Sequence, residues 1–362
     1  MSRLPALVVC LAMAVTVAAP VAKARDVADA APVASGVADV AKTEPAEEAT
    51  ADAATRRATA FVPPPPTGVR FGEPLEDGER FRLSYRFARV KSQGLLVADR
   101  DIRPGQVRSQ LFLPYVRTPR SLEVTVHRFR VEYAPHPRVT LVADLPFVKK
   151  ELERMDATDR FQDQTEGVGD LGFAVVVPFI RKGRESSHVH VGFDVPTGAI
   201  RRGGAGEPLP YDSQIGNGTW DLEWGWTYRG AWQRFAWGAQ AVGHHPVRRN
   251  GRHYREGSRF EGSLWGAARL FAGLSSSVRV EWEKQNNIRG RDAGLDPIDD
   301  PAENPKARGG TRFAIAPGLA LELPQLASQR VSVELELPVH QDLDGPQLER
   351  DWTLEVAWQW AF

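Results

Sequence analysis

The sequence predicts an all-β fold, a transmembrane up-and-down antiparallel β-barrel of about 12 strands with short periplasmic turns and long extracellular loops. Three observations support this prediction. Apolar and polar residues alternate in segment after segment, and the connections between these segments alternate in length. The chain also ends in an aromatic strand, "WTLEVAWQWAF" at residues 352–362.

The N-terminus is typical of an exported protein. The first three residues form a short segment made positive by Arg3, residues 4–21 are almost all apolar, and Ala-Lys-Ala at 22–24 offers a cleavage site. These features predict a signal peptide over residues 1–24. An uncleaved anchor is the alternative, but the apolar stretch is short for a membrane span. The single cysteine, Cys10, lies within this segment, so we expect no disulfide or thiolate chemistry in the mature chain.

Residues 25–79 are predicted to form a disordered periplasmic arm. Residues 25–60 are rich in Ala, Asp, Glu and Thr and contain no aromatic residue, a composition that cannot bury a core. Four consecutive prolines at 63–66 predict a stiff, extended spacer. Because residues 61–70 directly precede the barrel, expected over 80–362, they are also a candidate plug that enters the lumen from the periplasmic side.

The barrel strands are predicted from alternation with a period of two. Residues 220–228, "WDLEWGWTY", place tryptophans on one face and acidic or small residues on the other. A tilted strand of about 10 residues crosses a bilayer with one face toward lipid and the other toward the lumen. The predicted strands cover residues 80–90, 121–133, 138–147, 168–180, 188–193, 219–228, 235–244, 258–271, 275–283, 311–323, 330–338 and 352–362.

The lengths of the connections give a second signal, which does not depend on hydrophobicity. The long ones are residues 91–120, 148–167, 194–218, 245–257, 284–310 and 339–351. The short ones are residues 134–137, 181–187, 229–234, 272–274 and 324–329. Regular alternation of long loops and short turns is expected of an outer-membrane barrel, whereas a Greek-key sandwich has no reason to produce it.

The last strand is expected to close the ring against the first, so that no strand edge is left open in lipid. Its alternating aromatic residues also resemble the C-terminal signature by which the barrel-assembly machinery recognises outer-membrane proteins. For this strand alone, one edge of a soluble sandwich is the alternative. The expected lipid-facing aromatic residues are Trp220, Trp224, Trp226, Trp358, Trp360 and Phe362.

The opposite strand faces would line the lumen, and they carry charges of both signs. Buried charges must be hydrated or paired. The sequence therefore leaves two alternatives open: a water-filled channel with a wall of mixed sign, or a ladder of paired charges that fills a narrow barrel. The candidate lumen residues are Arg82, Asp170, Asp221, Glu223, Arg279, Glu281 and Glu334.

Other functional classes have little support. The 46 basic and 46 acidic residues balance, and no basic run alternates with aromatic residues, so no nucleic-acid partner is expected. No spacing of Ser, His and acidic residues indicates a catalytic triad, and we expect neither an enzyme nor a cofactor.

Metal sites are also not expected. The basic stretch 244–256 is placed in an outside loop, where its arginines can contact lipopolysaccharide phosphates, with a metal site as the weaker alternative. His188 and His190 share a strand face but have no evident third ligand. The acidic stretch 296–304 lacks the spacing of a calcium loop and is expected to be a solvated loop tip.

Four motifs resemble the outer-membrane family labelled phenol-degradation meta-pathway (MetA-pathway) transporters. They are "GVGDL" at 167–171, "DVPTG" at 194–198, "GNGTWD" at 216–221 and "LELPVHQDLDGPQL" at 335–348. The resemblance covers roughly residues 80–362. It implies a barrel that passes small, often aromatic or hydrophobic, compounds, and it carries over no catalytic residue.

The sequence as a whole thus favours a channel for passive passage of small solutes across the outer membrane of a Gram-negative bacterium. Its expected partners are outer-membrane lipid and lipopolysaccharide, the barrel-assembly machinery and a small-molecule solute. The alternative is a closed structural barrel or one whose loops bind an outside partner, and a barrel enzyme comes third.

Overall fold

The structure, a computed structural model, describes residues 62–76, 78–107, 115–200, 208–323 and 329–362. All of them belong to one compact unit, Ala54–Phe362. The expected signal peptide and residues 25–61 of the expected arm lie outside the described residues. Among the described residues, no helix is long and apolar enough to cross a membrane.

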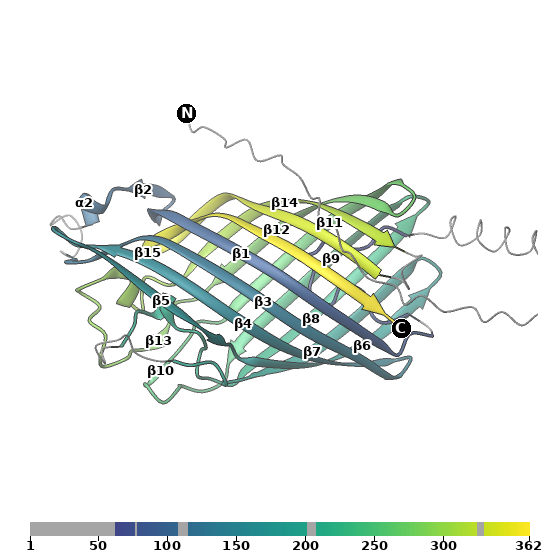
Figure 1. The fold of residues 1–362 in the computed structure, drawn as a ribbon, viewed down its shortest axis with the longest axis horizontal. Helices are drawn as coiled ribbons and strands as arrows, with labels where there is room; N and C mark the ends of the chain where they lie inside the picture. Colours follow the sequence, from purple (N-terminus) through teal and green to yellow (C-terminus); the bar gives the residue numbers. More distant parts are fainter. Residues whose placement is uncertain (1–61, 77, 108–114, 201–207, 324–328) are drawn as a thin grey trace, which may run out of the picture. The chain divides into compact units, whose positions relative to one another are not determined.

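Eleven strands form a closed antiparallel ring, which confirms the predicted fold class (Figure 1). They are β1 (Phe81–Ala98), β3 (Thr118–His136), β4 (Val139–Met155), β6 (Leu171–Lys182), β7 (Glu185–Val195), β8 (Asp221–Trp232), β9 (Phe235–Pro246), β11 (Arg259–Phe271), β12 (Leu274–Gln285), β14 (Gly310–Leu323) and β15 (Gln329–Ala361). As expected, the last strand closes the ring against the first, and the carbonyl of Phe362 accepts hydrogen bonds from Arg80 and Phe81 at 2.9 Å each.

The 33-residue strand β15 supplies two staves of this ring. Its residues 329–343 pair with β14, and its residues 343–361 pair with β1. Every neighbouring pair of strands is antiparallel. A ring made of an odd number of straight strands cannot close with all its neighbours antiparallel. The chain therefore reverses within β15, close to Gly345, whose φ is +91°. Ten strands give one stave each and β15 gives two, which agrees with the predicted count of about 12.

Several predicted loops are instead continuations of strands. Residues 91–98 belong to β1, residues 148–155 to β4, and the expected loop 339–351 lies entirely within β15. The ladder between β3 and β4 continues to Thr118 and Met155. Backbone pairing satisfies N–H and C=O groups whether or not the side chains alternate, so apolar periodicity underestimates strand length outside the membrane.

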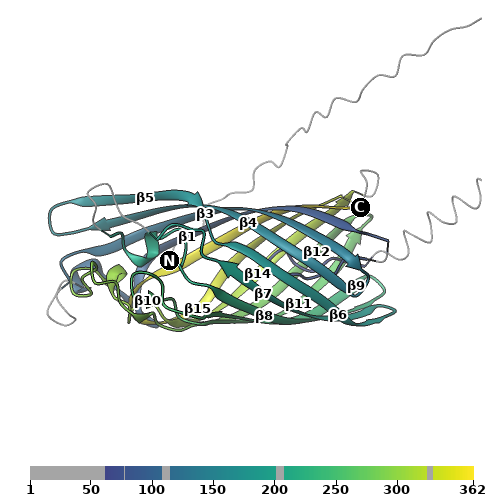
Figure 2. The same cartoon turned by 90° about the horizontal axis from the view of Figure 1, so that it is seen from below.

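The remaining elements are short. Strands β2 (Arg100–Ile102) and β5 (Arg160–Val168) pair with β1 and β4, and β10 (Tyr254–Arg255) pairs with β13 (Arg289–Gly290). Three helical turns complete the described residues: α2 (Pro104–Val107), η1 (Tyr211–Ser213) and η2 (Pro301–Glu303). Strands β5 and β10 lie at the end opposite the C-terminus in both views (Figures 1 and 2).

The two ends of the barrel differ in their connections. The turns that follow β3, β6, β8 and β11 are each two residues long. Three of them use a residue with positive φ, namely Gly183, Gln233 and Gly273, as tight hairpins require. We call this the short-turn end, which also carries the C-terminus, and we call the other the long-loop end.

Side chains alternate across the barrel wall as the sequence predicts. On β8, Trp224 is 44% exposed on the outer face, whereas Glu223 beside it is 4% exposed on the inner face. The outer face is thus an apolar belt, and the inner face is polar.

Candidate functional site

The N-terminal segment 62–76 crosses the inside of the ring, and we call it the plug. The N–H of Gly68 donates to Glu334 on β15 at 3.1 Å, and the N–H of Arg70 donates to Gln240 on β9 at 3.0 Å. These strands are not neighbours in the ring, so the plug bridges separate parts of the wall. The contacts agree with the plug expected at 61–70 and extend it to Glu76, so this part of the expected disordered arm is ordered.

Proline explains how an irregular segment can lie in a confined space. Pro63 and Pro66 are buried and have no N–H group, so only their carbonyl groups require partners. The carbonyl of Pro63 accepts a hydrogen bond from Arg229 on β8 at 2.8 Å. The four prolines therefore enter the lumen at a lower polar cost than another extended sequence would.

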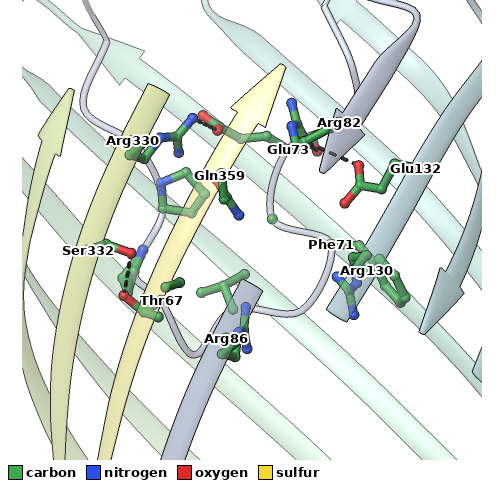
Figure 3. Close-up of a pocket in the computed structure, with 15 residues that line it drawn as sticks. Thr67, Phe71, Glu73, Arg82, Arg86, Arg130, Glu132, Arg330, Ser332 and Gln359 are labelled. Atoms are coloured by element: carbon green, nitrogen blue, oxygen red, sulfur yellow. Dashed lines mark hydrogen bonds and ion pairs between the residues drawn. The ribbon is translucent and has the colours of Figure 1, made fainter. Parts of the chain in front are cut away.

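Glu73 is the strongest anchor of the plug. Its carboxylate lies 2.5 Å from Arg229 on β8. It also lies 2.7 Å from Arg330 on β15, and the backbone carbonyl of Glu73 accepts from Arg82 on β1 at 2.9 Å (Figure 3). Burial by itself would raise the pKa of Glu73. The charges of Arg330, Arg229 and Arg82 outweigh burial and lower this pKa to about 2. Glu73 is therefore held as a carboxylate by three strands at once.

Little space remains between the plug and the wall formed by β1, β3 and β15. A cavity of about 40 Å³ is lined by Phe71 and Glu73 of the plug and by Arg82, Arg86 and Arg130 of the wall (Figure 3). One water molecule needs roughly 10–15 Å³ of such space. This cavity therefore has room for only a few water molecules and is too small for an organic solute.

Many wall charges pair with each other. Arg279 contacts Glu334 at 2.6 Å and Glu336 at 3.0 Å and also pairs with Glu281, while Arg82 lies 3.1 Å from Glu132. Five of the seven candidate lumen residues, Arg82, Glu223, Arg279, Glu281 and Glu334, take part in such ion pairs with the wall or the plug. The structure thus contains the ladder of paired charges that the sequence left as an alternative.

The other two candidates, Asp170 and Asp221, hold loop ends together at the long-loop end. The carboxylate of Asp170 accepts from the N–H groups of Gly198 and Asn217 at 2.8 Å each. The amide of Asn217 donates to Asp221 at 2.8 Å. The "GVGDL", "DVPTG" and "GNGTWD" motifs therefore meet in one hydrogen-bonded cluster, in which a Cβ on Gly198 would lie 2.7 Å from the Cα of Gly216.

The predicted aromatic residues lie on the outer face to different degrees. Trp220, Trp224, Trp226 and Phe362 are exposed, whereas Trp358 and Trp360 are half-buried. The indole N–H of Trp358 donates to Gln329 at 2.9 Å, and the ring of Trp360 lies 4.7 Å from that of Phe362. Neighbouring side chains thus cover part of the last strand.

Residues from the long connections pack together at the long-loop end. Tyr211, Tyr254, Ile288 and Leu295 form a buried apolar cluster. The expectation of a solvated tip at 296–304 is wrong for Asp300 and Glu303, which are buried and face Arg154 of β4 at 3.3 and 3.4 Å.

Glu303, beside this cluster, has a carboxyl group with a raised pKa. Burial raises its pKa to about 7, and the negative charge of Asp300 contributes to the increase. The carboxyl of Glu303 is therefore partly protonated near neutral pH.

Sequence reasoning missed the residues that connect the plug to the wall. Arg229 shares the inward phase of Glu223 on β8, and Arg330 shares that of Glu334 on β15, so strand alternation could have identified both. Glu73 lies in an irregular segment, and no periodic signal marks it. His244 was the last residue of the predicted strand 235–244 and the first of the basic stretch assigned to an outside loop. It belongs to β9 and faces Glu223 in the lumen.

Comparisons with known proteins support the fold. No family model and no curated protein matches the chain. The COG4313 outer membrane channel from Pseudomonas putida F1 is similar with a TM-score of 0.57 and 11% identity, covering 81% of this chain and 100% of that chain. A FadL homologue from Pseudomonas aeruginosa has a TM-score of 0.40 and 8% identity, covering 78% of this chain and 90% of that chain. Only the first similarity bears on the fold, and at 11% identity it concerns the barrel alone.

Proposed function

We propose that this protein is an outer-membrane channel of a Gram-negative bacterium, in which residues 62–76 close a passive path for small solutes. The short-turn end would face the periplasm and the long-loop end the outside. The motifs at 167–171, 194–198 and 216–221 favour the MetA-pathway transporter family, and with it small aromatic solutes. The proposal assigns no catalytic activity to the barrel.

The observation that carries this proposal is how the lumen is filled. A purely structural barrel would be filled by side chains of its own wall. Here a separate segment, joined to the ring only through the start of β1, occupies the space between strands. Its ion pairs and hydrogen bonds can be replaced by water when the segment moves. Val69 and Phe71 also pack against apolar residues of the wall.

Single-channel conductance in a planar bilayer tests the proposal. We expect the refolded protein to show rare or small steps, and a deletion of residues 62–76 to show frequent, larger ones. An equally long deletion at 40–54 controls for shortening of the chain. Heat-modifiable mobility in a detergent gel establishes that each barrel is folded. A folded 62–76 deletion variant that stays silent would contradict the channel.

A second function, binding of an outside partner by the loops, has one specific observation in its favour. The long connections pack around Tyr211 and Tyr254 and form a preorganised surface. If the deletion variant is silent, this function becomes the better explanation of the barrel.

A further inference from the structure

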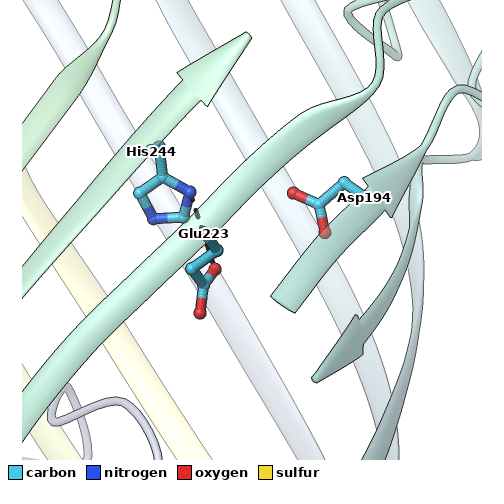
Figure 4. A group of neighbouring side chains, drawn as sticks. All are labelled: Asp194, Glu223 and His244. Atoms are coloured by element: carbon cyan, nitrogen blue, oxygen red, sulfur yellow. Dashed lines mark ion pairs between the residues drawn. The ribbon is translucent and has the colours of Figure 1, made fainter. Parts of the chain in front are cut away.

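Three ligand-type side chains meet on neighbouring strands inside the barrel. Asp194 of β7, Glu223 of β8 and His244 of β9 place a carboxylate oxygen or ring nitrogen within 4.8 Å of one another (Figure 4). The strand register explains the cluster: Glu223 pairs directly with His244, and its partner on β7 is Gly192, which has no side chain. Asp194, two residues further along β7, is the diagonal neighbour of Glu223.

A fourth side chain, on β7, lies next to the cluster. His190 is 1% exposed, and its Nε2 lies 3.2 Å from Oε1 of Glu223. Neither ring nitrogen of His190 nor Oε1 of Glu223 makes a well-formed hydrogen bond among the described residues. Buried polar atoms without such partners are uncommon in folded proteins and require an explanation.

In the structure, a positive charge of the plug, the guanidinium of Arg70, contacts this cluster. Nη2 of Arg70 lies 2.9 Å from Oε2 of Glu223, and its Nη1 lies 3.1 Å from Nε2 of His244. A guanidinium can only donate hydrogen bonds, so Nε2 of His244 must be the acceptor and carry a lone pair. The ring next to Arg70 is therefore in the state that binds a metal ion.

We propose that Asp194, Glu223 and His244 form a binding site for a divalent transition metal ion such as Zn²⁺, and that the metal competes with Arg70 of the plug. Carboxylate and imidazole donors suit Zn²⁺, whereas Ca²⁺ prefers oxygen donors alone. Metal–ligand bonds of about 2.1 Å require donor atoms roughly 3.5 Å apart. The ligand atoms of the three side chains must therefore approach one another by up to about 1 Å when a metal ion binds.

The competition follows from shared residues. Arg70 contacts Oε2 of Glu223 and Nε2 of His244, so its guanidinium lies against two of the three candidate ligand residues. A bound metal therefore displaces the guanidinium. Phe71, the next residue of the plug, packs 4.6 Å from the ring of His190, so displacement of Arg70 loosens the plug where it contacts β7, β8 and β9. This step rests on the proposed gating role of the plug, whereas the metal site itself does not.

Isothermal titration of the folded, full-length barrel in detergent with Zn²⁺ tests the site without any measurement of transport. We expect one Zn²⁺ per chain, no comparable binding of Ca²⁺, and loss of Zn²⁺ binding in Glu223→Gln. The Arg70→Ala variant should bind Zn²⁺ about tenfold more tightly, within the usual range of coupling between competing groups. His340→Gln, which removes an exposed imidazole, should bind as the wild type does.

Two outcomes would overturn the inference. Zn²⁺ binding that survives in Glu223→Gln places the metal elsewhere, and equal affinity in Arg70→Ala and wild type removes the competition. If Glu223→Gln does not fold, His244→Gln tests the same ligand set. Conductance in the presence of Zn²⁺ is measured separately: binding with competition but without opening would refute the gating step and leave the site in place.

Discussion

Replacement of Glu73 by glutamine tests whether charge holds the plug in the lumen. The side chains of Glu73, Arg229 and Arg330 are only 14%, 14% and 20% exposed, so solvent screens their ion pairs weakly. The decrease in the pKa of Glu73 from 4.5 to about 2 corresponds to about 3 kcal/mol in favour of the carboxylate. Glutamine keeps a hydrogen-bond acceptor but loses this term, so the equilibrium between open and closed plug should shift on the order of 100-fold.

Opening of the channel should therefore depend on pH, with more opening at low pH. The pKa of Glu73 is lower with the plug docked than in the free segment, so its stabilisation is complete above about pH 4.5. It is lost as the pH falls from 4.5 toward 2. The wild-type channel should therefore open increasingly in this window, whereas Glu73→Gln should already be open at pH 7 and change little.

Open probability in planar bilayers, measured at pH 7 and at lower pH, is the assay. Glu76→Gln is the matched control, because it removes the same charge from the same segment at an exposed side chain. Arg229 and Arg82 act on Glu76 through their charge, but it forms no ion pair within 4.0 Å to the described wall. Equal open probabilities for Glu73→Gln and wild type at pH 7 would show that the ion pairs of Glu73 do not hold the plug.

Three further changes have defined outcomes. Gly198→Ala brings a methyl group to 2.7 Å from the Cα of Gly216 and should cost about 1–3 kcal/mol, lowering the temperature of the heat-modifiable transition, whereas Gly266→Ala meets nothing within 4 Å and should not. Arg279→Met leaves Glu281 and Glu334 without their cation and Glu336 with Arg350 alone, and it should destabilise the barrel by about 3–5 kcal/mol in urea unfolding. The pKa of Glu303 is raised from 4.5 to about 7, so the stability of the loop cluster should fall by up to about 3 kcal/mol as the pH rises from 4.5 through 7. Glu303→Gln should abolish that decline in thermal unfolding measured at pH 5 and pH 8.

The barrel could be predicted from the sequence because its signals are local. Each stave shows its inner and outer faces within about 10 residues, as residues 220–228 illustrate, and the hairpin turns follow directly. The ends of the strands were harder to predict, since paired backbone beyond the apolar belt needs no alternation. Residues 339–351 show this limit: they contain a chain reversal at Gly345, yet they remain paired strand throughout.

The site could be predicted only in part, because its contacts join residues that are far apart in the sequence. Gly68 and Glu334 are 266 residues apart, and Glu73 and Arg330 are 257 residues apart. The position and proline stiffness of the segment near 63–66 made it a candidate for entering the lumen. It contained no information about which strands would receive Glu73. The register of β7, β8 and β9, which no local pattern specifies, likewise determines the meeting of Asp194, Glu223 and His244.

The wall charges fall into two sets, and this division explains why the sequence left both a filled and an open lumen possible. Arg279 and Arg130 pair with carboxylates of the wall itself, at 2.6 Å to Glu334 and 2.7 Å to Asp144, so they remain neutralised when the plug leaves. Arg229 and Glu223, in contrast, pair with Glu73 and Arg70 of the plug. A lumen that was only a structural filling would need the first set alone. Arg330 of β15 also pairs with Glu73, but it keeps Glu322 at 3.6 Å when the plug moves. Arg229 and Glu223 on β8 then expose one positive and one negative group, and we expect these two residues to determine the ion preference of the open channel.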